Sequence, residues 1–125
     1  MRRILVADDE EHISGLISDC LNAEGYEVVT ANNGQLAYDM FKDSHFDLLI
    51  TDIIMPEMDG LELIKQVKKL RPETKIIAMS AGGNKFTTDV YLDPAQTFGA
   101  DQRINKPFDL DELVTKVKEL IGENS

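Results

Sequence analysis

The sequence predicts an α/β domain in which helices pack on both faces of a parallel sheet. Short apolar runs, typical of buried strands, alternate with longer segments in which apolar residues recur at helical spacing. The alternation repeats five times in 125 residues, a length that suits one domain with one core, residues 1–125. Such a succession favours parallel strands joined by helical crossovers.

Five segments have the apolar character of strands, and polar or turn-forming residues follow each of them. We expect strands over residues 4–7, 26–30, 48–52, 75–79 and 102–105. The third is the most apolar, and Pro56 prevents its continuation. The fourth is expected to end at Ser80, with residues 81–84 as a loop.

Helical spacing of apolar residues follows four of these strands. The inward faces are expected to carry Ile13, Leu16, Ile17, Cys20 and Leu21; Leu36, Ala37, Met40 and Phe41; Leu63, Ile64, Val67 and Leu70; and Leu113, Val114, Val117, Leu120 and Ile121. Gly25 suits the end of the first helix, while Asn33, Asp59 and Asp109 suit helix starts, Asp109 forming a capping-box-like pair with Glu112. Residues 85–98 allow either a short helix beginning at Pro94 or a longer helix kinked there.

The composition limits the partners and the compartment. Hydrophobic residues make up 42% of the chain, which is enough for a packed interior. The net charge of −10 disfavours binding to nucleic acid or to anionic membranes. We expect no signal peptide and no membrane span. The single cysteine, Cys20, predicts no internal disulfide and is expected to be a buried small hydrophobe in a reducing compartment, hence the cytoplasm.

Polar residues gather at the carboxyl ends of the predicted strands. Asp8 and Asp9 follow the first strand, Asp52 ends the third, Ser80 ends the fourth and Lys106 follows the fifth. With a strand order of 2-1-3-4-5, the first and third strands flank the point where the order reverses, where ligands bind in such sheets. Three carboxylates there repel one another, and Mg²⁺ suits a few carboxylates with water and phosphate.

The same residues favour phosphoryl transfer to Asp52, forming an aspartyl phosphate. A metal ion and the Lys106 ammonium would offset the charge on the equatorial phosphoryl oxygens. The Ser80 hydroxyl would orient one of those oxygens. Positioning and electrostatics carry most of such a reaction.

Several short motifs, in this order along essentially the whole chain, resemble the receiver domains of bacterial two-component response regulators. They are Asp8-Asp9-Glu10, the segment 51–60 (TDIIMPEMDG), Met79-Ser80-Ala81, Gly99-Ala100-Asp101 and Lys106-Pro107-Phe108. Each motif is weak alone, but the set is highly specific. The resemblance implies the flavodoxin-like (βα)5 three-layer sandwich of the chemotaxis receiver.

The resemblance also implies residue roles. Asp52 would be the phosphoacceptor, and Ser80 and Lys106 would hold the phosphoryl group. The Mg²⁺ ligands would be Asp9, Asp52 and the main-chain carbonyl of Ile54, with Asp8 binding directly or through water. The phosphodonor would be a histidine kinase or a phosphotransfer protein. Such a domain catalyses only its own phosphorylation and dephosphorylation.

Two features depart from the family's pattern. Arg103 stands where receivers usually carry an aromatic residue, three positions before the lysine. The segment between Ser80 and Lys106 is a few residues longer than usual. We therefore hypothesise that the segment 82–98 is ordered or shifted during signalling, with a downstream protein bound on the face formed by residues 82–121. The chain would be a monomer or a phosphorylation-linked dimer.

Two other functions remain open at this stage. A Mg²⁺-dependent phosphohydrolase would use the same aspartate, but Ile54 stands where such enzymes place their acid/base carboxylate. A pseudo-receiver would be a docking module that is never phosphorylated, a reading that Arg103 favours slightly and the five polar residues oppose. The sequence also leaves open whether the chain acts alone or belongs to a longer regulator or hybrid kinase.

Overall fold

The computed structural model describes residues 2–55, 57–81 and 99–122. Within these residues the chain forms a five-stranded sheet of order β2-β1-β3-β4-β5. All neighbouring strands are parallel. The strands are β1 (Arg3–Ala7), β2 (Glu27–Ala31), β3 (Leu48–Asp52), β4 (Lys75–Ala81) and β5 (Gln102–Lys106). The predicted fold class and strand order are confirmed.

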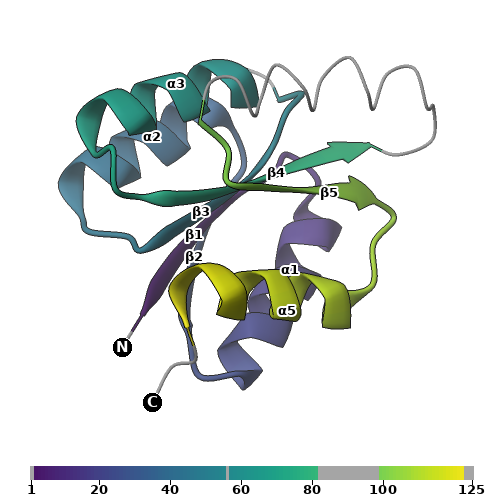
Figure 1. Cartoon of the computed structure of the whole chain (residues 1–125). Helices are drawn as coiled ribbons and strands as arrows, with labels where there is room; N and C mark the ends of the chain where they lie inside the picture. The colour runs from purple at the N-terminus through teal and green to yellow at the C-terminus, as the bar shows by residue number, and fades with distance from the viewer. Residues whose placement is uncertain (1, 56, 82–98, 123–125) are drawn as a thin grey trace.

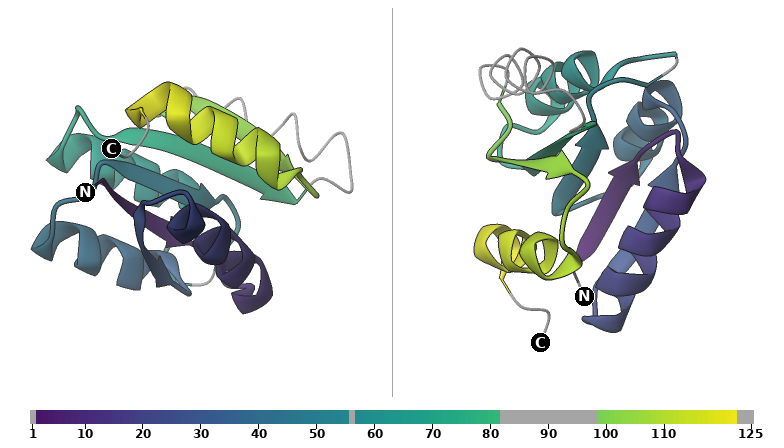
Figure 2. Two further views of the ribbon diagram at one scale, coloured as in Figure 1. Left: turned by 90° about the horizontal axis from the view of Figure 1, so that it is seen from below. Right: turned by 90° about the vertical axis from the view of Figure 1, so that its right-hand side faces the viewer.

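Helices cover both faces of the sheet. They are α1 (Glu11–Ala23), α2 (Gly34–Asp43), α3 (Gly60–Leu70) and α5 (Leu110–Ile121). Figure 1 shows α2 and α3 on one face and α1 and α5 on the other. Two further views show α1 and α5 lying together on their face (Figure 2). The helix expected within residues 85–98 lies outside the described residues.

The core has two layers, divided by the sheet. All five residues of β3 are buried, as expected for a central parallel strand. Side chains alternate along β3, so Leu49 packs with Phe41 and Leu63 under α2 and α3. Leu48 and Ile50 pack instead in the layer under α1 and α5. The central position of β3 therefore fixes where its last residue, Asp52, emerges.

The helix ends follow the predicted capping pattern. The Asn33 side chain accepts a hydrogen bond from the Leu36 N–H at 2.7 Å, and Asp59 accepts one from the Glu62 N–H at 2.9 Å. Gly25, just after α1, has a φ of 99°, which favours glycine. Asp109 caps α5 through the Asp111 N–H at 2.8 Å, rather than through the Glu112 N–H of a capping box.

Several predicted positions need correction. Leu16, Leu36 and Leu70 are exposed by 44%, 39% and 44%, although the helical spacing placed them inward. Cys20 is only partly buried. A helix resting on a sheet buries a narrower stripe than its whole apolar face, so residues at the edges of that stripe stay in solvent.

The boundaries of four strands also differ from the prediction, and β1 begins one residue earlier and β5 ends one residue later than expected. β4 continues through Ser80 to Ala81, because these residues pair with Asn105 and Lys106 of β5. β2 begins and ends one residue later than expected. Since residue 81 belongs to β4, the carboxyl ends of β4 and β5 stay in register up to Lys106.

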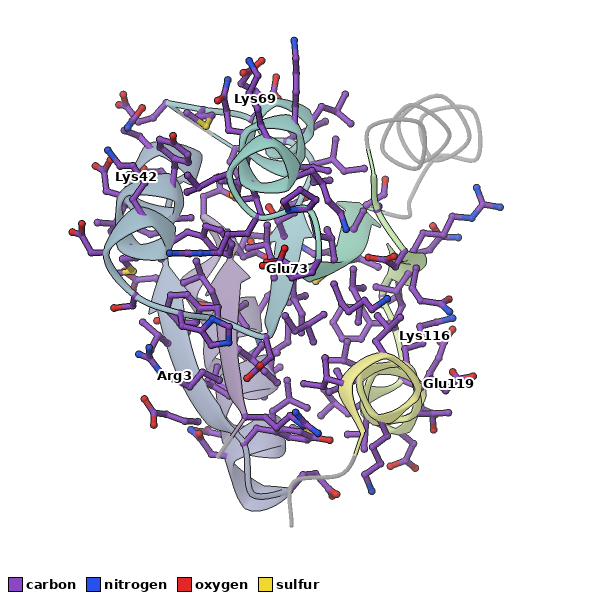
Figure 3. The ribbon with its side chains drawn as sticks, turned by 60° about the vertical axis from the view of Figure 1, so that its left-hand side comes forward. Arg3, Lys42, Lys69, Glu73, Lys116 and Glu119 are labelled. Carbon is purple, nitrogen blue, oxygen red and sulfur yellow. The ribbon has the colours of Figure 1, made fainter. Side chains whose placement is uncertain are left out.

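A basic and an aromatic side chain contact each other at the amino-terminal end of β1. The Arg3 guanidinium lies 4.6 Å from the centroid of the Phe46 ring and bonds Glu27 at 2.9 Å. Figure 3 shows Arg3 at this edge, whereas Lys69 and Glu119 project outward from α3 and α5. Among the described residues, no helix is long and apolar enough to cross a membrane.

Candidate functional site

Strand register brings the predicted polar residues to one edge of the sheet. Ala7 pairs with Thr51, so Asp8 and Asp52 follow neighbouring positions on β1 and β3. Asp52 pairs with Met79, and the next residue of β4 is Ser80. Lys106 is the last residue of β5, two strands away from β3. Asp8, Asp52 and Lys106, from three strand ends, therefore meet where the strand order reverses, and Ser80 lies near the end of β4 at the same edge.

The Lys106 ammonium lies at the centre of this group. Its Nζ is 2.7 Å from Asp8 Oδ2 and 3.0 Å from Asp52 Oδ2. A third carboxylate oxygen, Glu10 Oε1, lies 3.4 Å from the same nitrogen. Asp8, Asp52 and the lysine are buried, so the contacts with Asp8 and Asp52 form with little water around them. An ammonium there offsets part of the repulsion between the carboxylates.

The burial of Asp52 changes its acidity. Burial raises the pKa of the Asp52 carboxyl, and the negative charge of Asp8 adds to that effect. The Lys106 ammonium and a hydrogen bond from the Ile54 main-chain N–H act in the opposite direction without cancelling the rise. Asp52 is therefore a carboxylate whose charge depends on a neighbouring cation.

Lys106 responds differently to the same surroundings. Burial by itself favours the neutral amine and lowers its pKa, but the hydrogen bond to Asp8 and the charge of Asp52 outweigh burial. The pKa of the Lys106 ammonium is consequently raised above its usual value. The Lys106 side chain therefore stays positively charged at neutral pH and above it.

Close packing shapes the turn after β3. The Thr51 hydroxyl donates to the Asp52 carbonyl oxygen at 2.8 Å, and the Gly60 N–H donates to the Ile53 carbonyl oxygen at 2.6 Å. A Cβ atom at Gly60 would overlap the main-chain oxygen of Asp52. The start of α3 thus lies directly against the phosphoacceptor candidate, and glycine is required there.

Ser80 and Ile54 occupy contrasting environments. Ser80 is buried at the carboxyl end of β4, next to the strand that carries Asp52. The Ile54 side chain is 54% exposed beside the site. The main-chain N–H of Ile54 hydrogen-bonds the Asp52 carboxylate, while its apolar side chain faces solvent.

The acidic donor set suits a hard divalent cation. One carboxylate oxygen from each of Asp8, Glu10 and Asp52 lies within 4.8 Å of the others. Oxygen ligands with a net negative charge are what Mg²⁺ prefers in proteins. Asp9 is exposed and is not a member of this group. The sequence analysis gave Glu10 no role at the site, although it lies in the acidic run 8–11 and in the motif Asp8-Asp9-Glu10.

Comparison with known proteins decides the family. The model of the response regulator receiver domain matches residues 4–118, nearly the whole chain. The chain belongs to the response regulator receiver family.

Relatives of this receiver domain differ in length. The DNA-binding transcriptional regulator NtrC of Azospirillum brasilense is 41% identical over 98% of the chain, which spans only 24% of that protein. The response regulator receiver protein CpdR of Brucella abortus is 34% identical over 97% of the chain and 98% of its own length. The chain thus spans about a quarter of some relatives and nearly all of others.

A solved structure resembles this receiver domain closely. Response regulator TrrA from Thermotoga maritima, in complex with Mg²⁺-BeF, superposes with a TM-score of 0.82. It is 40% identical, and the comparison covers 96% of this chain and 99% of that one.

A small apolar groove adjoins the site of the receiver domain. It has a volume of about 270 Å³ and lies between the first half of α1 and the segment that follows β5. Its lining consists of Ile13, Leu16, Ile17, Lys106, Pro107, Phe108 and Leu110. Lys106 therefore contributes both to this groove and to the carboxylate cluster. The exposed Leu16 belongs to the groove rather than to the core.

The structure shows the position of Arg103, which stands where receivers usually carry an aromatic residue. Arg103 is exposed on β5, in register with Ala78 of β4. Its neighbour Ile104 is buried under α1 and α5, so alternation directs Arg103 to the other face of the sheet. The segment 82–98, to which the signalling hypothesis was attached, lies outside the described residues.

Proposed function

We propose that residues 1–125 act as a phosphorylation switch in a two-component phosphorelay. Asp52 accepts a phosphoryl group from the phosphohistidine of a histidine kinase or a phosphotransfer protein, in a reaction that needs Mg²⁺. The modification changes a surface that binds another protein. The chain catalyses only its own phosphorylation and dephosphorylation.

One observation carries this proposal. The buried side chains of Asp52 and Lys106, from different strands, meet at 3.0 Å. A second carboxylate, that of Asp8, contacts the same ammonium. A buried ion pair contributes little to stability compared with apolar packing, so its presence at a strand-end ligand site favours a chemical role. The solved structure of the related TrrA contains Mg²⁺-BeF, which supports Mg²⁺-dependent phosphorylation of the present chain.

The residues divide the chemistry between them. One Asp52 carboxylate oxygen attacks the phosphorus, and the bond from phosphorus to the donor imidazole nitrogen breaks with its electron pair left on the ring. Lys106 exchanges its Asp52 contact for a phosphoryl oxygen, and the Ser80 hydroxyl orients another. Asp9, Asp52 and the Ile54 carbonyl, with Asp8 directly or through water, would hold Mg²⁺, which would supply positive charge to the developing transition state.

The apolar groove beside Lys106 suits the phosphodonor. A donor must bring its phosphohistidine to Asp52, so its contact surface has to lie next to Lys106. The groove between α1 and the segment after β5 shares Lys106 with the site and is lined mainly by apolar side chains. We place an apolar face of the phosphodonor protein there.

The proposed output surface adjoins this groove and shares Lys106, Pro107, Phe108 and Leu110 with it. A downstream protein binds the face formed by residues 82–121, of which β5 and α5 are described. By the hypothesis drawn from the sequence, the segment 82–98, which lies outside the described residues, would be ordered or shifted on phosphorylation. Equal amide exchange across 82–98 in the free and phosphorylated forms, with output still changing, would rule this out. The domain is cytoplasmic, binds no nucleic acid or membrane itself, and is a monomer or a phosphorylation-linked dimer.

The rival functions are less well supported. The exposed apolar side chain of Ile54 provides no acid or base, which a phosphohydrolase needs beside its nucleophile. A pseudo-receiver would have no use for the buried arrangement of Asp8, Asp52 and Lys106, whose charges are costly to desolvate.

The test is the intact mass of the protein after incubation with Mg²⁺ and acetyl phosphate. The wild type is compared with Asp52→Asn, with an EDTA control, and with Asp43→Asn as a charge-matched control. Asp43 is exposed at the C-terminal end of α2, before β3 begins, whereas Asp52 is the last residue of β3. We expect one phosphoryl group on the wild type and on Asp43→Asn only, and only with Mg²⁺.

Other outcomes separate the alternatives. Phosphorylation of Asp52→Asn would exclude Asp52 as the acceptor. No phosphorylation of the wild type, together with no binding of Mg²⁺, would favour a pseudo-receiver. Mg²⁺ binding without phosphorylation calls for a phosphohistidine donor in place of acetyl phosphate, and failure with that donor as well would overturn the proposal.

A further inference from the structure

Glu10 is attached to the carboxylate cluster at two points. Its main-chain N–H donates to Asp8 Oδ1 at 2.9 Å, and its side-chain Oε1 lies 3.4 Å from Lys106 Nζ. Asp8 is fully buried, so the first contact fixes the Glu10 backbone against a rigid part of the site. The second directs its carboxylate toward the same cation that Asp8 and Asp52 bind.

The charges of the cluster do not balance without another cation. Three carboxylates converge on one ammonium, which leaves two negative charges in excess. One divalent cation would neutralise this excess. The number of carboxylates around such an ion is a main determinant of its affinity. Glu10 therefore adds one negative charge to those of the buried pair Asp8 and Asp52.

The three carboxylates differ in their freedom to move. Asp8 and Asp52 are buried and held close to Lys106, at 2.7 and 3.0 Å. The Glu10 side chain is 61% exposed and makes the longest of the three contacts. Glu10 can therefore change partners by rotating its side chain, without disturbing the core.

We propose that Glu10 is a mobile anionic member of the cation site. Its carboxylate contacts the Lys106 ammonium, and with Mg²⁺ bound it would turn to the metal ion, directly or through water. The exchange frees Lys106 for a phosphoryl oxygen as the metal arrives. This role rests on the proposed function, and it adds Glu10 to the ligands Asp8, Asp9 and Asp52 without replacing any of them.

The neighbouring residue Glu11 provides a matched control. It has the same side chain and charge and is also exposed, in the first turn of α1. Its carboxylate is not part of the cluster of three. Any effect of Glu10→Gln that Glu11→Gln also shows is a general effect of net charge.

The experiment is calorimetric titration of Mg²⁺ into the wild type, Glu10→Gln and Glu11→Gln, at low salt and in about 0.5 M KCl. We expect Glu10→Gln to weaken Mg²⁺ binding about five- to tenfold at both salt concentrations, because a ligand charge is lost. Glu11→Gln should weaken binding less than about twofold, and the effect should vanish in high salt. The unfolding midpoint in EDTA should be the same for all three proteins.

The outcomes keep this inference separate from the proposed function. Equal Mg²⁺ affinities of Glu10→Gln and Glu11→Gln in high salt would overturn the role of Glu10, while a wild type that binds Mg²⁺ and is phosphorylated would leave the proposed function intact. A wild type that binds no Mg²⁺ would overturn both. Glu10→Asp provides a further arm: its shorter carboxylate should restore part of the lost affinity, and the absence of any rescue would count against a direct charge role.

Discussion

Lys106 and Asp52 meet at 3.0 Å between Nζ and Oδ2, although 54 residues separate them in the chain. The contact crosses β4, which lies between their strands, so it forms only at the sheet edge beyond the strand ends. Asp8 joins the same ammonium from β1 at 2.7 Å. Removal of the lysine therefore leaves two buried carboxylates facing each other.

Replacement of Lys106 by methionine should lower stability at neutral pH by about 2 to 3 kcal/mol, because the buried Asp8 and Asp52 lose their counter-charge. Without the ammonium the folded-state pKa of Asp52, already raised by burial, rises further, so the variant is least stable above that pKa. We expect the deficit to shrink at about pH 5 and on addition of Mg²⁺. Urea unfolding under these conditions tests this, with the exposed Lys69→Met as control. A deficit independent of both pH and Mg²⁺ would contradict it.

The Asp47 carboxylate should make the stability of the fold depend on pH in the acidic range. Burial raises its pKa, but hydrogen bonds from the Arg3 N–H, at 2.9 Å, and from His45 outweigh burial, and the pKa is lowered. A carboxyl whose pKa is lower in the folded protein stabilises it above its unfolded pKa of about 3.9 and loses this contribution as the pH falls.

Asp47→Asn should therefore be less stable than the wild type at pH 7 by about 1 kcal/mol, and equally stable near pH 2 to 3. Unfolding by urea across this range measures the difference, and Asp43→Asn serves as an exposed control. A stability difference between Asp47→Asn and the wild type that persists unchanged at low pH would show that Asp47 stabilises the fold through packing and not through its charge.

Two glycines should respond to alanine in opposite directions. A Cβ at Gly60 would overlap the Asp52 carbonyl oxygen, whereas nothing lies within 4 Å of a Cβ at Gly15 in the middle of α1. Gly60→Ala should cost about 2 kcal/mol or more, since backbone must shift, and should weaken Mg²⁺ binding. Gly15→Ala should stabilise by about 0.5 to 1 kcal/mol through helix propensity. Thermal unfolding of both variants measures this. Equal effects would refute the packing argument for Gly60.

Ile54 should affect the lifetime of the aspartyl phosphate. Its exposed apolar side chain offers no polar group to position an attacking water, so we expect a long-lived phosphoryl group on Asp52. Ile54→Gln should shorten the lifetime several-fold, and Ile54→Ala should leave it within about threefold, because neither isoleucine nor alanine hydrogen-bonds water. Intact-mass measurements that follow the loss of the phosphoryl group with time give this lifetime. Much faster dephosphorylation of the wild type than of Ile54→Ala would contradict the argument.

The sequence could predict most of the framework. The apolar runs and helical spacing gave the parallel fold, because a strand buried on both faces has to be apolar along its length, as β3 is. Helix caps such as Asp59 could be predicted, because a cap bonds a main-chain N–H only three residues further along the chain. Local chemistry of this kind does not need the rest of the chain.

Helix faces were predicted less well. Leu16 and Leu70 have the spacing of core residues but lie in solvent. Spacing gives the direction of a side chain around its own helix axis. The width of the buried stripe depends on how closely the helix approaches the sheet, and that is set by residues distant in sequence.

The sequence by itself determined which strand ends carry the carboxylates, the hydroxyl and the lysine, because each follows directly from where an apolar run stops. Only the tertiary structure decided which of them touch. It placed Glu10, and not Asp9, with Asp8 and Asp52 around Lys106, and it directed Arg103 away from the layer that holds Ile104. The physical reason is that side-chain directions alternate along a paired strand, whereas beyond a strand end they follow the turn of the loop and the nearest charge.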